Sequence, residues 1–347
     1  MSEATSFNQN PIGTGPMVFV EAVSEQYARF NMNKSYWRGT PHLDEFVWAV
    51  IPDEDAQVIA LSNGEIDVIK NVYGPDMEQR ILDTGDTVIY QLLGAFTRTV
   101  YFNQVNYEPF QDKLVREAIA YGFDKDAVVN AIYGVEGAVA DQLFNTTHWG
   151  YNPDVRLIDY DEEMAKTKLA EAGWEDTDGD GIVDKDGQPL SFTVTVENGR
   201  EADAQAFQDY MGRIGIEISI QSFERAVWYE HRDSGDWDVF IGWDGSALAE
   251  DALTRRVTDG WASSMNPDID DRVLIISSSL DQQARIDAAQ EIMAIIQEEV
   301  YSIPYSYYQS KIAVKDYVKG LQDPPTGADY QATGVFYHLE DLYIDQS

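Results

Sequence analysis

Two segments of the chain carry the same strand, helix, strand pattern, and this pattern restricts the fold more than any other feature. Residues 46–50 and 66–69 are strand-like apolar runs separated by a short helical run. Residues 216–220 alternate apolar with polar side chains, and a helical run separates them from the apolar run at 238–243. In both segments the turn between the helix and the second strand has the same order of residue types: glycine, acid, apolar, aspartate, valine, apolar. Coincidence in a common helix-to-strand turn is the alternative explanation of this match. Such units build parallel sheets, so the pattern predicts an α/β fold with two similarly built lobes.

Helical runs preceded by aspartate occupy much of the remaining chain. Asp112, Asp124 and Asp281 each precede apolar residues at helical spacing, as N-cap residues do, and either Asp53 or Asp55 can cap an earlier helix in the same way. The run after Asp281 is the longest and is predicted to continue to Pro304. A chain of 347 residues is longer than one core usually supports, and no low-complexity segment or long linker interrupts it. We therefore expect two lobes connected by strands that cross between them.

The chain is strongly acidic. Asp and Glu number 61 and Lys and Arg 24, which gives a formal charge of −37. This balance excludes a nucleic-acid surface and disfavours an anionic membrane surface, because both require clustered basic groups. Hydrophobic residues make up 44% of the chain, more than a disordered acidic chain carries, so the protein is globular. The charge favours a protein of a high-salt environment, with a merely acidic mesophilic protein as the alternative.

The sequence lacks the common catalytic motifs. The four histidines, His42, His148, His231 and His338, do not have the spacing of a metal-binding pair, and no nucleophile elbow, phosphate loop or dinucleotide loop occurs. Cysteine is absent, which excludes disulfides and thiolate nucleophiles. A carboxylate pair of the glycosidase type carries little information among 61 acids. No catalytic constellation can be assembled from these residues, so we expect no enzyme, with a saccharide-acting hydrolase as the alternative.

One acidic loop matches a calcium-binding pattern. Asp176, Asp178, Asp180 and Asp184 stand at positions 1, 3, 5 and 9 around a glycine at position 6. Hard Ca²⁺ prefers oxygen ligands, which this spacing supplies, but Gly187 occupies position 12, where a calcium loop carries a bidentate glutamate. The loop is a candidate structural calcium site, with an acidic turn as the alternative. No other cofactor is expected.

Tryptophans lie in several glycine-bearing segments. Trp149, Trp243 and Trp261 are found in HWGYNP, GWDGSALAEDA and DGWASSMN. Large rings in loops, with acids nearby, are typical of a cleft that closes on a small polar ligand. Packing at the surface of a lobe is the alternative for each ring.

The order of several longer segments resembles one family. The segments are GTGP from Gly13, NKSYWRGTPHLDEFVWAVIPDEDAQVIALSNGEIDVI from Asn33, VYFNQ from Val100, DKLVREAIAYGFDKDAVV from Asp112, HWGYNPDV from His148, YDEEMAKTKLAEAGW from Tyr160 and GDWDVFIGW from Gly235. Together they resemble the dipeptide/oligopeptide-type (family 5) extracytoplasmic solute-binding proteins of ABC transporters. The resemblance covers nearly the whole chain.

The resemblance implies an α/β fold of the two-lobed periplasmic-binding-protein type (class II, cluster C), with mixed sheets flanked by helices. It implies lobe I at residues 1–102 and 311–347, lobe II at 103–310, and a hinge near Asn103 and Ser310. Family members are usually longer and carry a signal sequence or lipoprotein anchor. The chain is therefore expected to be an N-terminally truncated, halophilic member with a partial first lobe. Its expected location is periplasmic or at the cell surface, with membrane contact only through the missing anchor.

The same resemblance implies a function and site residues. A peptide or similar small polar solute would be bound between the lobes of a monomer and delivered to ABC permease subunits. Asp244 or Asp251 would hold the amino group of the ligand, Arg200 would hold its carboxylate, and Trp243 and Trp149 would line the cleft. Relatives that bind oligosaccharides, nickel complexes or haem leave the ligand open.

Overall fold

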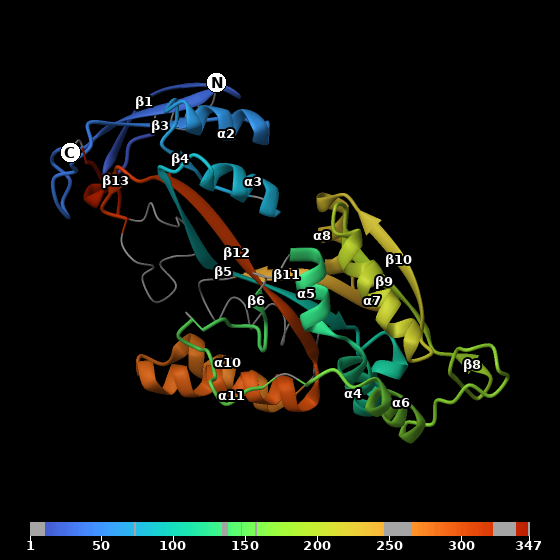
Figure 1. Ribbon diagram of the computed structural model, residues 1–347. Coiled ribbons are helices and arrows are strands. Elements are labelled where there is room, and N and C mark those ends of the chain that lie inside the picture. Colours follow the sequence, from blue (N-terminus) through green and yellow to red (C-terminus); the bar gives the residue numbers. More distant parts are fainter. Residues whose placement is uncertain are drawn as a thin grey trace, which may run out of the picture. The chain divides into compact units, whose positions relative to one another are not determined.

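The structure, a computed structural model, divides the chain into two compact units. It describes residues 11–72, 74–133, 138–146, 148–156, 158–245, 266–321 and 338–345, with the backbone alone at 92, 94, 95, 243–245 and 310. Unit 1 comprises Met1–Leu92 and Ser310–Ser347, and unit 2 comprises Leu93–Gln309. The chain passes between the units twice, within strands β5 (Thr87–Phe102) and β12 (Ser302–Lys315) (Figure 1). The hinge expected near residues 103 and 310 stays a prediction, since contacts define units and do not identify a hinge.

Unit 1 combines an antiparallel sheet with a helical pair. Strands β1, β2 and β3 form the sheet in that order, and Phe30 of β2 lies opposite Phe19 of β1 and Phe46 of β3. Helices α2 and α3 share a core with β4 that contains Leu61 and Ile81. The bounds are β1 Met17–Val23, β2 Tyr27–Met32, β3 Glu45–Ala49, α2 Glu54–Ser62, β4 Val68–Ile69, α3 Gly74–Leu82, β13 Val318–Lys319, the 3-10 helix η4 Leu339–Asp341 and β14 Tyr343–Ile344.

The prediction that the first strand, helix, strand unit contributes two strands to one parallel sheet is wrong. Strands β3 and β4 form where they were expected, but they belong to different sheets. β3 pairs antiparallel with β2, the strand before it, and β4 pairs antiparallel with β12, where Ala313 lies opposite Ile69. Apolar periodicity identifies a strand but does not identify its neighbour, and here each strand found an antiparallel partner.

Unit 2 is organised around a mixed sheet. Its strands follow the order β10, β9, β11, β5, β12, with β6 also paired to β12. β10 and β11 are both parallel to β9, and β11 is antiparallel to β5. The second predicted unit therefore contributes two parallel strands, with β9 inserted between them. The strands of the mixed sheet include β6 Ala138–Val139, β9 Ser191–Glu197, β10 Glu217–Phe223 and β11 Val239–Gly245, whereas β7 Asp184–Lys185 and β8 Gln188–Pro189 pair in a separate two-stranded sheet.

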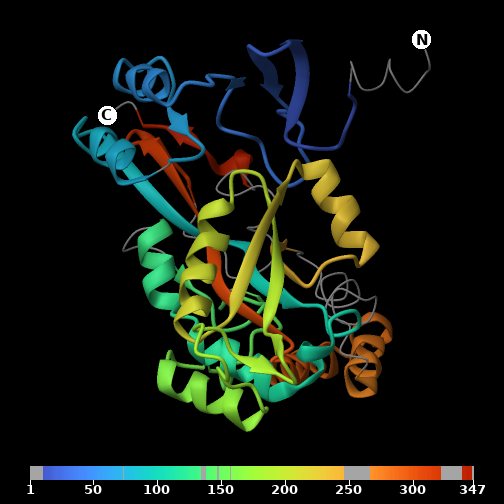
Figure 2. The same ribbon diagram turned by 90° about the vertical axis from the view of Figure 1, so that its right-hand side faces the viewer.

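Helices cover both faces of this sheet. Phe207 and Met211 of α7 pack with Val194 of β9 in the main core, whereas Trp228 of α8 packs with Phe240 of β11. Val239, which lies opposite Val194, belongs to the main core, and its neighbour Phe240 packs with Trp228. Neighbouring residues of a strand point to opposite faces, so α7 and α8 lie on opposite sides of the sheet (Figure 2). The helices are the 3-10 helix η1 Glu108–Gln111, α4 Lys113–Gly122, α5 Lys125–Tyr133, α6 Glu162–Glu171, α7 Glu201–Arg213, α8 Arg225–Ser234, α10 Pro267–Ser278 and α11 Gln282–Glu299.

The predicted helix starts are confirmed. The side chains of Asp53, Asp112, Asp124 and Asp281 each accept a hydrogen bond from a backbone N–H of the first helical turn, at 2.8, 2.9, 2.9 and 2.9 Å. The end expected for α11 at Pro304 is wrong. Val300 adopts a left-handed conformation with φ 51°, which stops the helix at Glu299.

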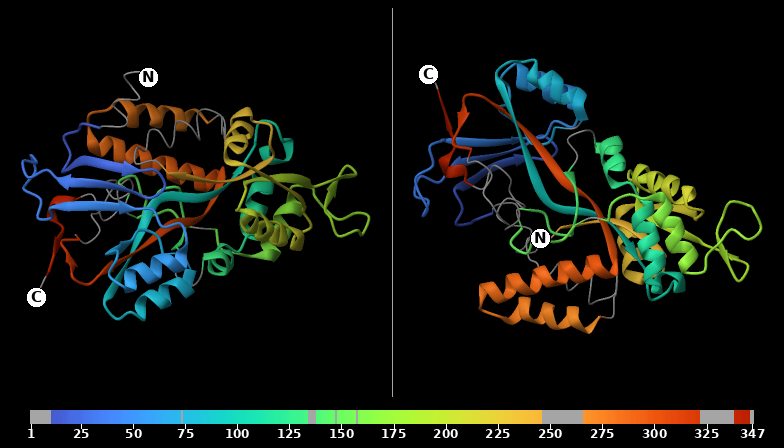
Figure 3. Two further views of the ribbon diagram at one scale, coloured as in Figure 1. Left: turned by 90° about the horizontal axis from the view of Figure 1, so that it is seen from above. Right: turned by 60° about the horizontal axis from the view of Figure 1, so that its bottom comes forward.

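Helices α10 and α11 run antiparallel and side by side (Figure 3). They share a core with the segment around Phe144, to which Ile269, Ile292 and Met293 contribute. Among the described residues, no helix combines the length and the apolar character needed to cross a membrane.

Candidate functional site

The carboxyl ends of β9 and β11 lie at one edge of the unit 2 sheet. The two strands are adjacent and parallel, with Val239 opposite Val194 and Phe240 opposite Thr195. The segment after β9 begins with Asn198, and the segment after β11 begins with Ser246. In α/β sheets ligands bind outside the carboxyl ends of parallel strands, so both predicted binding loops start where a ligand site is expected.

A pocket opens at this edge and is rich in charge. Arg200, predicted to hold the carboxylate of a ligand, is one of its lining residues. The lining comes from β5, β9, β11, β12, α7, α8 and the residue before α7. It consists of Arg98, Glu197, Arg200, Asp203, Trp228, Ile241, Gly242 and Tyr305.

Arg200 stands immediately before α7. It is the N-cap residue of this helix, it is half-buried, and its side chain makes no capping hydrogen bond. Asn198 and Gly199 are exposed, so the side chain follows a short turn out of β9. Its place is set by the β9 to α7 connection, which brings it to the edge of the sheet.

Asp203 is the buried acid of the pocket. It is 4% exposed, and its Oδ1 accepts hydrogen bonds from the hydroxyls of Tyr133 at 2.5 Å and Tyr305 at 2.6 Å. Burial, with a further contribution from the charge of Asp203, raises the pKa of both tyrosines, so the hydroxyls stay protonated donors. The guanidinium of Arg98 lies over the ring of Tyr133, 4.3 Å from its centroid.

Glu197 and Trp228 complete the pocket. The Glu197 carboxylate accepts a hydrogen bond from Nε of Arg225 at 2.5 Å, and the Arg225 side chain is 63% exposed. The ring of Trp228 lies 4.5 Å from that of Phe240, and its buried Nε1–H has no hydrogen-bond partner among the described residues. The pocket thus combines positively charged donors, negatively charged acceptors and aromatic side chains.

Sequence reasoning missed Arg98, Glu197, Asp203 and Trp228. A signal was present for two of them. Arg98 alternates with Val100 and Phe102 along β5, which places its side chain on their face of the strand. Asp203 stands four residues before Phe207 on α7, and so lies on the apolar face of the helix. A charged residue in a core-facing register is uncommon and indicates a special role.

The other predicted ligand residues do not join this pocket in the described chain. The structure describes only the backbone of Trp243 and Asp244, which follow Ile241 and Gly242 in β11, and Asp251 and Trp261 lie outside the described residues. Trp149 is half-buried against the α10 and α11 core, with Arg285 over its ring at 5.3 Å. Its role in ligand binding stays a prediction.

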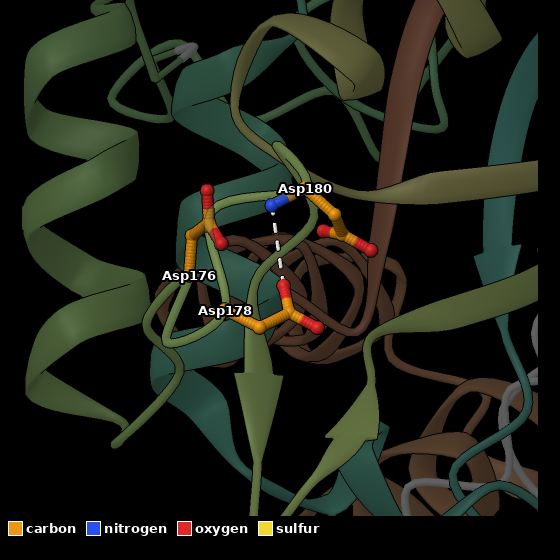
Figure 4. A group of neighbouring side chains, drawn as sticks. All are labelled: Asp176, Asp178 and Asp180. Atoms are coloured by element: carbon orange, nitrogen blue, oxygen red, sulfur yellow. Dashed lines mark hydrogen bonds between the residues drawn. The ribbon is translucent and has the colours of Figure 1, made fainter.

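The acidic loop brings three of its four predicted ligands together. Carboxylate oxygens of Asp176, Asp178 and Asp180 lie within 4.8 Å of one another, on exposed side chains (Figure 4). Asp184 is turned toward Thr177 and accepts hydrogen bonds from its backbone N–H at 2.9 Å and from its hydroxyl at 2.7 Å. Three clustered carboxylates supply fewer groups than the six to eight oxygen ligands that Ca²⁺ takes, so the calcium assignment stays a prediction.

Comparison with known sequences identifies similar proteins. The family model described as "Bacterial extracellular solute-binding proteins, family 5 Middle" matches residues 2–262. The "Oligopeptide-binding protein AppA" of Bacillus subtilis is 34% identical over 257 residues, which are 72% of this chain and 47% of that protein. The "Nickel-binding periplasmic protein" of Escherichia coli is 25% identical over 334 residues, or 92% of this chain and 64% of that protein. The chain thus spans about half to two thirds of the length of these relatives.

Comparison with solved structures gives the same fold. The structure of the oligopeptide-binding protein AppA from Bacillus subtilis in complex with a nonapeptide matches with a TM-score of 0.70 and 27% identity. The match covers 99% of this chain and 69% of that one. The described chain, with mixed sheets flanked by helices, therefore has the two-lobed periplasmic-binding-protein fold expected from its sequence.

Proposed function

Because the chain belongs to the family 5 bacterial extracellular solute-binding proteins, we propose that it captures a small polar solute and delivers it to the permease of an ABC importer. A peptide is the first candidate, since the relative with 34% identity is an oligopeptide-binding protein. The family consists of binding proteins that act outside the cytoplasm. We propose the same location for this chain, without catalytic activity of its own.

The observation that carries the proposal is the charged pocket at the carboxyl ends of β9 and β11. Two arginines, Arg98 and Arg200, and two acids, Glu197 and Asp203, line it. A peptide with free termini has one positive and one negative end, and each end needs a partner of opposite charge when water is removed. Asp244, one of the two residues predicted to hold the ligand amino group, lies near the carboxyl end of β11.

Ligand capture is proposed to involve closure of two lobes. The predicted lobes, 1–102 with 311–347 and 103–310, are connected by β5 and β12, and two strand connections suit a hinge. Trp243 and Trp149 would then line the closed site. A decrease in the radius of gyration on ligand addition, measured by small-angle X-ray scattering, is the expected sign of closure.

A peptide-binding measurement tests the proposal. We expect thermal stabilisation of the protein, in 2 M NaCl, by members of a library of di- to pentapeptides with free termini, because a ligand that binds only the folded state raises its stability. Isothermal calorimetry on the best members should give a defined stoichiometry. Arg200→Gln should weaken binding about 10-fold or more, because it removes a charge-assisted hydrogen bond. Arg80→Gln, an exposed change in unit 1, is the control for net charge.

Other outcomes would redirect the assignment. If no peptide binds but a nickel chelate or an oligosaccharide does, the peptide assignment is wrong and the transport assignment stands. The hydrolase alternative predicts consumption of an oligosaccharide, which mass spectrometry of the incubated solution would detect. Recovery of intact ligand after prolonged incubation supports binding without catalysis.

A further inference from the structure

A second pocket lies in unit 2, and in the described chain it shares no lining residue with the pocket at the carboxyl ends of β9 and β11. Its walls come from α4, α5, α11, β12, the segment after β6 and the segment before α6. Most of the lining side chains are apolar, among them Leu143, Ile158 and Ile303. The pocket has a volume of about 40 Å³, which is room for about three water molecules. A ligand of this pocket is therefore small and mainly apolar.

Lys125 is a buried cation at the wall of this pocket. It is 4% exposed, and its Nζ donates a hydrogen bond to the carbonyl of Ile158 at 2.8 Å. Both residues of this hydrogen bond line the pocket, which places the amine at its wall. An ammonium group has three donors, and among the described residues this is the one hydrogen bond recorded for Nζ, with no ion pair. The charged form is therefore poorly compensated for the water it has lost.

The surroundings of Lys125 act on its pKa in opposite directions. Burial has the larger effect and lowers the pKa to about 8, whereas three nearby carboxylates act to raise it. About half of the Lys125 side chains are therefore neutral amines at pH 8, and a neutral, desolvated amine is a nucleophile. The three carboxylates are those of Asp124, Asp126 and Asp159, and the other charged residues that line the pocket are Asp141 and Arg156.

The acids near Lys125 decide which covalent adduct fits this position. Reaction of the amine with an aldehyde gives an imine, which can take up a proton and keep the positive charge that the acids favour. Reaction with carbon dioxide would replace the cation by an anionic carbamate, which the same acids disfavour, and acylation would remove the charge. The apolar walls favour an aliphatic chain, and the volume of the pocket limits the chain to a short one.

We propose that Lys125 is a covalent binding site for short aliphatic aldehydes. The amine nitrogen attacks the carbonyl carbon and forms a C–N bond. Both protons of the neutral amine leave with the carbonyl oxygen as water, and a C=N bond remains, so the step needs no oxidant or reductant. The proposal goes beyond the proposed function and does not depend on it, because it concerns a pocket with a different lining.

Reductive trapping of propanal tests the proposal. The full chain is incubated with propanal and cyanoborohydride, which converts an imine into a stable secondary amine, and peptide mass spectrometry identifies the labelled lysines. Exposed Lys34, Lys70 and Lys319 provide the comparison within each sample. At pH 7 Lys125 should be labelled about 10-fold faster than these lysines, because lysine side chains in water have a pKa near 10.4 and very few neutral amines at this pH. Its labelling rate should level off above about pH 8, while the other rates keep rising.

Two controls separate a binding pocket from a merely reactive amine. Unfolding in concentrated urea should abolish the preference for Lys125, because the preference depends on burial. 1-Pyrenecarboxaldehyde, which is much larger than the pocket, should label Lys125 more slowly than the exposed lysines. Propanal labelling of Lys125 at pH 7 that is no faster than that of the exposed lysines would overturn the proposal. So would a preference for Lys125 that the large aldehyde shares. The peptide-binding measurement tests the proposed function separately.

Discussion

Buried charges in unit 2 are satisfied mainly by neutral groups. Arg116 is 2% exposed and donates to backbone carbonyls, among them that of Glu299 at 2.7 Å. Lys125 is 4% exposed and donates to the carbonyl of Ile158 at 2.8 Å, and burial lowers its pKa to about 8. Asp203 is bound by two tyrosine hydroxyls. Arg98 differs, because its guanidinium lies over the ring of Tyr133 and no hydrogen bond from it is recorded within the described chain.

His148 is predicted to make the protein sensitive to acid. Burial lowers its pKa from 6.5 to about 4. Its ring stacks on that of Phe144, with the ring centroids 3.9 Å apart, and its Nδ1 accepts a hydrogen bond from the N–H of Gly150. Its buried Nε2 has no partner within the part of the chain that the structure describes. Below pH 6.5 the unfolded chain binds a proton at this ring and the folded chain does not, so stability falls as pH drops toward 4. One such group contributes about 1.4 kcal/mol per pH unit, or about 2 kcal/mol between pH 6.5 and 5.

Urea denaturation at pH 7 and pH 5 measures this effect. The acid-induced loss of unfolding free energy should be about 2 kcal/mol smaller in His148→Phe than in the wild type. Exposed His42 provides the control, and His42→Gln should lose as much stability as the wild type. An equal loss in all three proteins would contradict the buried, neutral state of His148, as would a directly measured NMR pKa near 6.5.

At the scale of elements, local signals set where helices begin, and partners set how strands pair. The aspartate caps of α2, α4, α5 and α11 act on N–H groups two or three residues away, so the sequence reveals them directly. The apolar run at β3 also predicted a strand correctly, but this strand pairs with β2 and not with β4. Pairing depends on which edges the rest of the fold leaves available.

The acidic loop between α6 and β7 gives a prediction for this scale. With a dissociation constant near 0.1 to 1 mM, typical of extracellular calcium modules, 5 mM CaCl₂ should stabilise the protein by about 1 to 2 kcal/mol. Thermal unfolding with 5 mM CaCl₂ or 5 mM MgCl₂ measures the difference. A variant with Asp178→Asn and Asp180→Asn should lose the calcium response, because it removes two of the three clustered carboxylates.

A matched variant separates calcium binding from general charge. Asp209→Asn with Asp236→Asn removes the same charge at exposed positions outside the loop, and this variant should respond to calcium as the wild type does. Identical unfolding temperatures of the wild type in the two cations would identify the loop as an acidic turn.

The molecule combines a high net negative charge with an apolar core. Its formal charge is −37, while the main core of unit 2 consists of buried apolar side chains such as Phe102, Val194 and Phe207. The acids repel one another through solvent, and this repulsion opposes the compact state. Salt is therefore expected to change the free energy of unfolding through the summed repulsion of many acids, and not through any single ion pair.

Salt should stabilise the protein. Raising NaCl from 0.1 to 1 M shortens the screening length from about 10 to 3 Å, which weakens repulsion between exposed carboxylates. Unfolding free energy measured with urea, which adds no charge, should increase across this range. Tetramethylammonium chloride at equal ionic strength should act similarly if screening is the cause. A flat or falling salt dependence would argue against the high-salt interpretation of the acidic composition.

The sequence by itself determined the α/β class, the helix starts, most strands and, through the order of its segments, the family. These features depend on contacts within a few residues or on long ordered stretches, which a linear pattern records. It also predicted a ligand-binding role for Arg200, which lines the candidate pocket, and that role stays a prediction.

Only the tertiary structure decided which residues meet. Arg98, Asp203, Trp228 and Tyr305 come from four different elements and line one pocket, a neighbourhood that no local pattern contains. The position of Trp149, which packs against the core of α10 and α11, could not be read from a local pattern either. The physical reason is that burial and pairing depend on the edges and faces left over once all elements have packed, and these are properties of the whole fold.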